Sequence, residues 1–139
     1  MPDDPSGDQI VLTLPASPEF VRLARLTTAG LATRVGMGYD EVEDLRIAVG
    51  EACSLLIGPG TRIGTLTLTF TMTDDAVEVA INGTLQGSVP TDPDTELSDQ
   101  ILDAVVDEHV VEINLDRVWL AKRHGALDVT GPSGGPVRA

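Results

Sequence analysis

One acidic residue, Glu51, occupies a position where it could do chemistry. It lies in the segment DLRIAVGEACSLLI, residues 44–57, whose apolar residues recur at the three- and four-residue steps of an amphipathic helix. A carboxylate held on a helix can act as a general base that takes a proton from an attacking hydroxyl group. It can equally be a glutamate on the solvated face, and the segment alone leaves both interpretations open.

A second candidate, Arg25, lies in the preceding segment RLARLTTAG. The planar guanidinium fork suits the recognition of carboxylates, and arginine is common among the residues that dominate binding energy at protein interfaces. The alternative interpretation is a solvated helix arginine that pairs with a nearby acid.

The other reactive residue types predict no further site. The chain has one cysteine, Cys53, so it can form no internal disulfide and no thiolate metal cluster, and we expect this residue to be small and buried. His109 and His124 have no companion at the spacing of metal ligands, so we predict no metal site. Trp119 falls in a strand pattern, and we expect it in the core rather than in a binding site.

The charge of the chain restricts its partners. The 139 residues carry a formal net charge of −13 and are 42% apolar, which fits one domain with a core. An acidic surface repels phosphate backbones, so we expect no nucleic-acid partner; it suits a partner with basic patches or serves only to keep the protein in solution. The chain shows no signal peptide and no membrane-spanning run, which predicts a cytoplasmic protein with no membrane partner.

Two predicted helices carry the candidate residues. Apolar residues that alternate over 10–14 predict a first strand, after which Ser17 is a plausible N-cap for a helix that ends at Gly36. The next helix is predicted to begin with Asp40 as its N-cap and Glu43 as the partner in a capping box, and to end at the GPG segment.

The rest of the chain predicts a sheet against which these helices pack. Apolar residues alternate with threonines over 66–72, and a second alternating run over 76–83 completes a hairpin. A third helix is predicted over 96–108, with Leu97 on its apolar stripe, and two strands flank residues 114–116.

The predicted order is therefore β-α-α-β-β-α-β-β. It indicates an α+β two-layer sandwich, in which one antiparallel or mixed sheet is covered by about three helices. We expect residues 1–8 to be mobile, 9–124 to form the domain and 125–139 to be a disordered tail, because the two ends lack hydrophobic periodicity.

A family resemblance rests on the segment SPEFVRLARLTTAGLATRVGMGYDEVEDLRIAVGEAC, residues 17–53. This segment closely resembles the N-terminal half of the bacterial anti-sigma-factor serine kinases of the general-stress and sporulation type. These kinases belong to the histidine-kinase-like (Bergerat-fold, or GHKL) ATPase superfamily. The resemblance implies a dimeric switch protein that holds a sigma factor inactive and uses ATP and magnesium to phosphorylate a serine on a small anti-anti-sigma protein.

The resemblance assigns roles on the second helix. The family motif is typically E-A-x-T/S-N-A, and Glu51 matches its general base. Leu55 stands where the asparagine of the motif would bind magnesium through its amide oxygen, one helical turn later. Leucine has no lone pair to offer a hard cation, so the resemblance implies a magnesium site without its protein ligand.

Two further nucleotide motifs are altered. In the D-x-G motif Gly83 matches the glycine, but Ile81 replaces the aspartate that binds the adenine amino group. In a shifted register Asn82 would face the base, and the glycine would then be out of step. The G-x-G pair of the third motif falls near Glu96 and Ser98, which removes the glycine-rich phosphate cradle.

These changes predict weak or absent binding of ATP and magnesium. The two lost polar contacts, to adenine and to the metal, would weaken ATP binding by roughly 10²–10⁴-fold. Arg25, by contrast, matches the arginine with which the family contacts both the sigma factor and the anti-anti-sigma protein. We therefore predict a stress-response regulator of transcription, a homodimeric anti-sigma-factor-like switch with a degenerate nucleotide site and little or no kinase activity.

Two alternatives remain open at this stage. An active ATP-dependent serine kinase that acts on an anti-anti-sigma protein is supported by Glu51 and Gly83. The other is a structural dimerisation domain that has lost both the catalytic and the partner-binding role.

Overall fold

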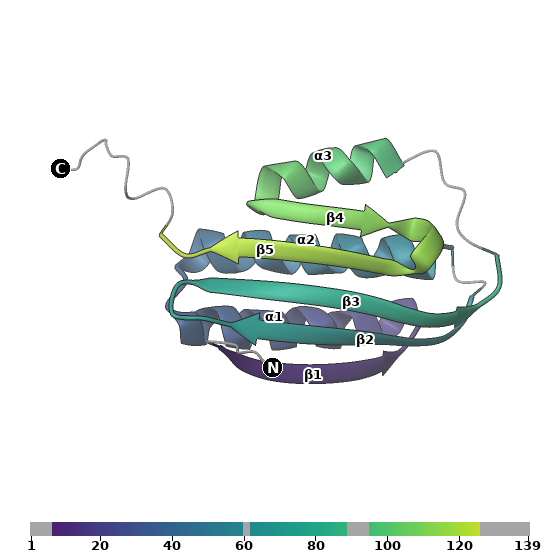
Figure 1. Ribbon diagram of the computed structural model, residues 1–139, viewed down its shortest axis with the longest axis horizontal. Coiled ribbons are helices and arrows are strands. Elements are labelled where there is room, and N and C mark those ends of the chain that lie inside the picture. Colours follow the sequence, from purple (N-terminus) through teal and green to yellow (C-terminus); the bar gives the residue numbers. More distant parts are fainter. Residues whose placement is uncertain (1–6, 60–61, 89–94, 126–139) are drawn as a thin grey trace.

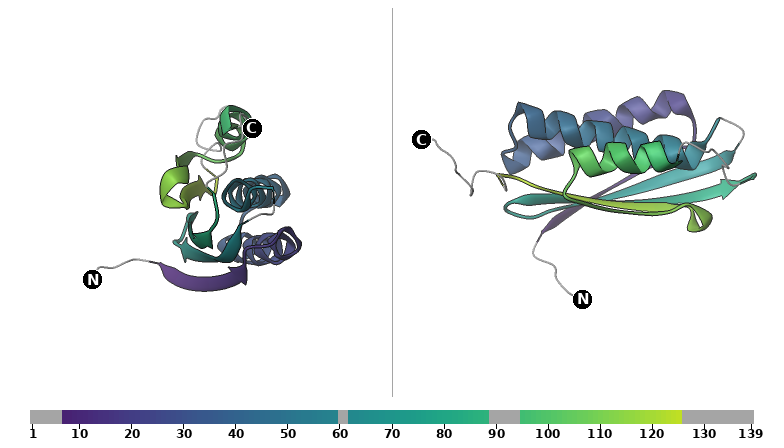
Figure 2. Two further views of the ribbon diagram at one scale, coloured as in Figure 1. Left: turned by 90° about the vertical axis from the view of Figure 1, so that its right-hand side faces the viewer. Right: turned by 90° about the horizontal axis from the view of Figure 1, so that it is seen from above.

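A computed structural model describes residues 7–59, 62–88 and 95–125, and these form two layers (Figures 1 and 2). One layer is a five-stranded antiparallel sheet, and the helices form the other. The predicted α+β sandwich and its element order are confirmed. The segments predicted to be mobile or disordered lie almost entirely outside the described residues.

The strands lie in the spatial order β1-β2-β3-β5-β4, and each is antiparallel to its neighbours. In chain order the elements are β1 (Asp8–Pro15), the 3-10 helix η1 (Pro18–Phe20), α1 (Val21–Val35), α2 (Tyr39–Ile57), β2 (Ile63–Met72), β3 (Ala76–Gln86), α3 (Thr95–Val105), β4 (Glu108–Glu112), the 3-10 helix η2 (Ile113–Leu115) and β5 (Arg117–Arg123). No helix in the described ranges combines the length and the apolar character that a membrane crossing requires.

The start of α2 differs from the prediction. Gly38, not Asp40, is the N-cap, and the Glu41 Oε1 atom accepts a hydrogen bond of 2.9 Å from the backbone N–H of Gly38. Glu43 instead forms an ion pair with Arg46, one turn later. The helix starts where Glu41, three residues after Gly38, reaches back to a free backbone donor.

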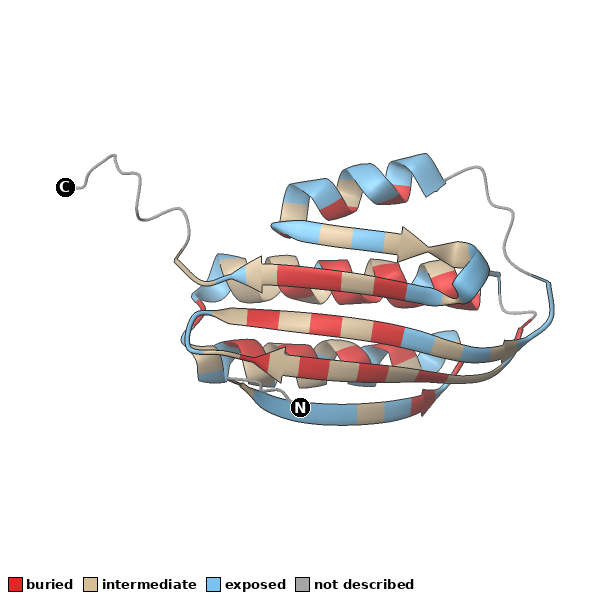
Figure 3. Cartoon of the chain, in the orientation of Figure 1, coloured by how far each residue is buried: buried red, intermediate tan, exposed pale blue. Residues whose placement is uncertain are grey.

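The core lies between the helices and one face of the sheet (Figure 3). Because side chains alternate along a strand, every second residue of β2 and β3 points into this core. Those residues are Leu66, Leu68, Phe70, Met72, Val77, Val79 and Ile81. Leu45, Val49 and Leu56 of α2 are fully buried against them. The alternation predicted for the hairpin is confirmed.

The second face of the sheet is not covered by the helices (Figure 2). One row of residues crosses this face from edge to edge, with one residue from each strand: Val11, Thr69, Ala80, Trp119 and Val110. We call this set the open-face row. The expectation that Trp119 lies in the core is wrong, because its strand neighbours Val118 and Leu120 take the buried face and leave it half-buried on the other.

One residue of the stripe predicted for the third helix faces outward. Leu97, predicted to be on the apolar stripe, is 53% exposed, whereas Ser98 is 5% exposed. Ser98 and Leu102 are one turn apart and are the buried residues of α3. A serine on the buried side requires a polar partner, and that partner is Glu51.

Candidate functional site

The carboxylate of Glu51 contacts α3. Its Oε2 atom accepts a hydrogen bond of 2.6 Å from the Ser98 hydroxyl, and this bond joins residues that are 47 positions apart. Glu51 is half-buried, so its carboxylate is not fully solvated, and it already accepts a hydrogen bond. The hydrogen bond fixes the side of α2 that carries Glu51 against the N-terminal half of α3.

Leu55 follows one turn later on the same side of α2 and is half-buried. Its hydrocarbon side chain provides no metal ligand. Within the described ranges, no three histidine, cysteine or carboxylate side chains are grouped closely enough to hold a metal ion.

The structure separates the candidate residues of β3. Ile81 is fully buried in the core. Asn82 pairs with Thr67 and Arg117 on the open face, and it is exposed. Gly83 lies on the face of Ile81, and its backbone N–H donates a hydrogen bond of 2.7 Å to the carbonyl oxygen of Asp116. Asn82 and Gly83 therefore do not line one pocket.

An ion pair that no sequence pattern predicted lies beside Gly83. The Arg62 side chain is 2% exposed and that of Asp116 is 19% exposed, and the guanidinium donates two hydrogen bonds of 2.8 and 3.0 Å to the carboxylate. It donates a third, of 3.0 Å, to the carbonyl oxygen of Leu56 near the end of α2. This network ties the end of α2 to the start of β5. Its two side chains are 54 positions apart, so no local motif signals it.

Arg25 reaches from α1 to α2. It is half-buried, and its guanidinium rests over Gly50. No hydrogen bond or ion pair joins Arg25 to another residue in the described part of the chain. The local ion pair, which was the alternative interpretation, is therefore not formed within these residues.

The surroundings of Arg25 are basic and apolar. Helix α1 contains Arg22, Arg25 and Arg34 and no acidic residue, although the whole chain has a net charge of −13. Leu26, the residue after Arg25, is 58% exposed, whereas the exposed Leu23 lies on the opposite side of the helix with Arg34. An exposed apolar side chain next to an arginine without an acid in the described ranges is a composition typical of a protein interface.

Cys53 lies one turn from Gly50 on α2 and is fully buried, as predicted. Burial raises the pKa of its thiol to about 12, although the nearby positive charge of Arg25 lowers that pKa in part. The thiol is therefore protonated at neutral pH and is not a nucleophile.

The histidines serve as structural links. The Nδ1 atom of His124 lies 2.9 Å from Glu41 Oε1, and the Gly125 N–H donates to Glu41 Oε2 at 2.8 Å. Burial acts to raise the pKa of Glu41, but these hydrogen bonds and the one from Gly38 outweigh it and hold the pKa below its ordinary value. His109 lies on the inner side of β4, 3.4 Å from Asp99 and Asp103 of α3.

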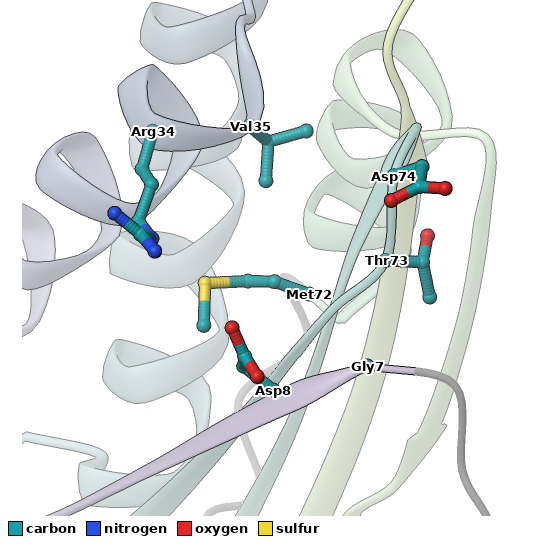
Figure 4. Close-up of a pocket in the computed structure, with 7 residues that line it drawn as sticks. All are labelled: Gly7, Asp8, Arg34, Val35, Met72, Thr73 and Asp74. Atoms are coloured by element: carbon teal, nitrogen blue, oxygen red, sulfur yellow. The ribbon is translucent and has the colours of Figure 1, made fainter.

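One pocket lies where β1 begins, α1 ends and β2 turns into β3 (Figure 4). Residues from the start of β1, the end of α1 and the β2–β3 turn line it: Gly7, Asp8, Arg34, Val35, Met72, Thr73 and Asp74. None of the predicted site residues lines this pocket, and its polar lining is open to solvent.

Comparison with known proteins matches residues 14–109 to the histidine kinase-like ATPase domain. The chain is similar to the serine-protein kinase RsbW of Bacillus subtilis, with 53% identity over 49 residues, which cover 35% of this chain and 31% of that protein. It is also similar to RsbW of Halalkalibacterium halodurans, with 48% identity over 50 residues, 36% of this chain and 31% of that protein. The matched segment thus spans about a third of these relatives.

A solved structure shows the same fold. A crystal structure of RsbU and RsbW domains from Mycobacterium tuberculosis aligns with a TM-score of 0.62 and 15% sequence identity. The alignment covers 84% of this chain and 32% of that chain.

Proposed function

The chain belongs to the histidine kinase-like ATPase family, and on that premise we propose that it is a cytoplasmic protein–protein switch of the anti-sigma-factor type. The family resemblance predicted from the sequence is confirmed. In this proposal α1 binds a sigma factor or an anti-anti-sigma protein, and the nucleotide site is degenerate. The observation that carries the proposal is Arg25, a half-buried cation with no acidic partner among the described residues.

The charge distribution supports an acidic partner for α1. A guanidinium that already had an intramolecular acid would have to give up that ion pair before it bound another carboxylate. Arg25 has no such ion pair within the described ranges, so its fork is free for a partner carboxylate. Leu26, the next residue of the same helix, is 58% exposed and supplies apolar area beside that contact.

Three features of α2, α3 and β3 support a degenerate nucleotide site. Leu55 provides no magnesium ligand, and Ile81 is an apolar residue fully enclosed in the core. Glu51 is hydrogen-bonded to Ser98 of the same chain. These residues do not fit magnesium and ATP, so we assign no phosphoryl-transfer step to this protein.

We extend the proposal to a homodimer formed through the open face of the sheet. The open-face row places Trp119, Val110 and Val11 in one line across all five strands, and the last two are 48% and 61% exposed. Such a row would be buried when two copies pack face to face. Trp119→Lys is expected to give a monomer by light scattering, whereas Leu97→Lys, at an exposed apolar residue of α3, leaves the dimer intact.

The partner-binding proposal is tested by charge reversal. Arg25→Glu should weaken capture of the sigma factor encoded nearest to the gene for this chain by at least about thirtyfold, as for the loss of a hot-spot residue. Arg34→Glu is the matched control, because Arg34 is exposed and lies on the opposite side of α1. Equal affinities of wild type and Arg25→Glu would show that this surface is not the binding site.

The alternative of an active serine kinase rests on Glu51, which keeps the position of the general base. Calorimetric titration with Mg-ATP separates the two functions. Micromolar binding that a Gly83 substitution abolishes, followed by phosphate transfer to an anti-anti-sigma protein, would favour the kinase. No detectable binding would favour the switch without catalysis.

A further inference from the structure

Gly50 is an unusual residue for its position. It is buried in the middle of α2, where glycine is less favourable than alanine because of its greater conformational freedom. Its backbone is helical, so no positive φ demands a glycine there. The reason must lie in what a side chain at this position would meet.

A Cβ atom at Gly50 would meet the guanidinium of Arg25. It would lie 2.6 Å from Nε, 2.8 Å from Nη2 and 3.0 Å from Cζ, all shorter than a van der Waals contact. Three guanidinium atoms at similar distances mean that the group itself, and not the aliphatic stem, rests on the glycine. By contrast, a Cβ atom at Gly30, on α1, would meet no atom within 4 Å.

Among the described residues, Arg25 is therefore held in place by its fit against Gly50 and not by an ion pair. The cation lies close enough to α2 to act on the thiol of Cys53, one turn away from Gly50. Long arginine side chains lose conformational freedom when they bind, and an arginine already seated on a surface loses less.

We propose that Gly50 is a positioning residue that seats the Arg25 guanidinium against α2 and so orients its fork toward the carboxylate of an acidic partner protein. The inference rests on the proposed function, because it assigns the partner contact to Arg25. It adds a residue on a second helix to that binding site, and it identifies the absence of a side chain as the feature that matters.

Gly50→Ala is the direct test. The methyl group must displace the guanidinium, and the backbone need not move because the obstacle is the end of a flexible side chain. We expect the variant to bind the sigma factor roughly ten- to hundredfold more weakly, which corresponds to the loss of one charge-assisted hydrogen bond. Gly30→Ala, the same change in a helix without an obstacle, should leave the affinity unchanged and keep or raise thermal stability.

The contact between the Arg25 guanidinium and Gly50, which we call the seat, can be measured without a partner protein. In the free wild-type protein, NMR should show a nuclear Overhauser effect between the Arg25 Nε–H and the Gly50 α-proton that points along the missing Cβ bond. The signal should be lost in Gly50→Ala. If the wild-type protein lacks it, the seat does not exist and the inference is overturned.

A double-mutant cycle with Arg25→Ala covers the remaining outcomes. If Gly50 acts through Arg25, Gly50→Ala has no further effect on affinity in a protein that already carries Arg25→Ala. Should Gly50→Ala alone fail to fold, Arg25→Ala restores folding, because it removes the side chain that the new methyl group would meet. An effect of Gly50→Ala that persists in the Arg25→Ala background overturns the inference. If Arg25→Ala weakens binding and Gly50→Ala does not, the inference fails and the proposed function stands. If Arg25→Ala has no effect on affinity, the inference and the proposed function both fail. The NMR signal then still reports whether the Arg25 guanidinium lies on Gly50.

Discussion

The buried Arg62–Asp116 ion pair provides a quantitative test of what holds α2 to the sheet. Asp116→Asn removes the charge but keeps the size of the side chain, and asparagine tolerates the left-handed backbone of this residue, φ 55°. The change leaves the Arg62 guanidinium, 2% exposed, without its counter-ion. Breaking one side of a buried pair costs about 3–5 kcal/mol, a large fraction of the roughly 5–15 kcal/mol by which a domain is stable.

Urea denaturation followed by the fluorescence of Trp119, the one tryptophan, measures this loss. With an m-value of about 2 kcal/mol per molar urea, the midpoint should fall by roughly 1.5–2.5 M. Glu112→Gln is the matched control, because the Arg117–Glu112 pair has a similar chemistry at 2.6 Å but is 51% and 41% exposed. Its midpoint should stay close to that of the wild type, since water screens exposed pairs. Equal midpoints for the two variants would refute the argument that burial makes the Arg62 pair indispensable.

Two further predictions concern titratable groups. The pKa of Glu41 is lowered in the folded state from an ordinary value of 4.5, so its contribution to stability is present above that pH and is lost as the pH falls through the folded-state pKa. The difference in urea midpoint between wild type and Glu41→Gln should therefore shrink as the pH falls below about 4.5. A difference that does not change with pH in this range would contradict this. The Cys53 thiol has a pKa raised to about 12, so it should react with Ellman's reagent at pH 8 only as the protein unfolds. The reaction rate should therefore rise with urea along the unfolding curve. Fast reaction of the native protein would show that the residue is accessible.

Local patterns predicted the elements well and their ends less well. The alternation over 66–72 and the turn after it determine the β2–β3 hairpin, because period-2 alternation can bury only one face of a strand. The predicted N-cap of α2, Asp40, was wrong. Both Glu41 and Glu43 could complete a capping box, and only the backbone geometry selects Glu41. Trp119 was placed wrongly for a related reason: alternation shows that a strand has two faces, but not which face the helices cover.

The candidate site, likewise, could be predicted from the sequence only in part. Family resemblance singled out Glu51 and Arg25 from their neighbours along the chain, since the motifs that carry it are contiguous on α1 and α2. It did not provide their contacts. Ser98 binds Glu51 only because α3 packs beside α2, and this hydrogen bond spans 47 positions. The sequence places Gly50 next to Glu51 without a sign that it supports Arg25.

By itself, then, the sequence determined the order of the strands and helices and the family, while the loss of the magnesium and adenine ligands at Leu55 and Ile81 stays a prediction. These follow from periodicity and side-chain chemistry, which are properties of neighbouring residues. Only the tertiary structure decided that Glu51 is engaged by Ser98, that Arg62 and Asp116 form a buried pair, and that Arg25 rests on Gly50 without an acid in the described part of the chain. Each is a contact between distant segments, and packing of α1, α2 and α3 on one face of the sheet brings them together.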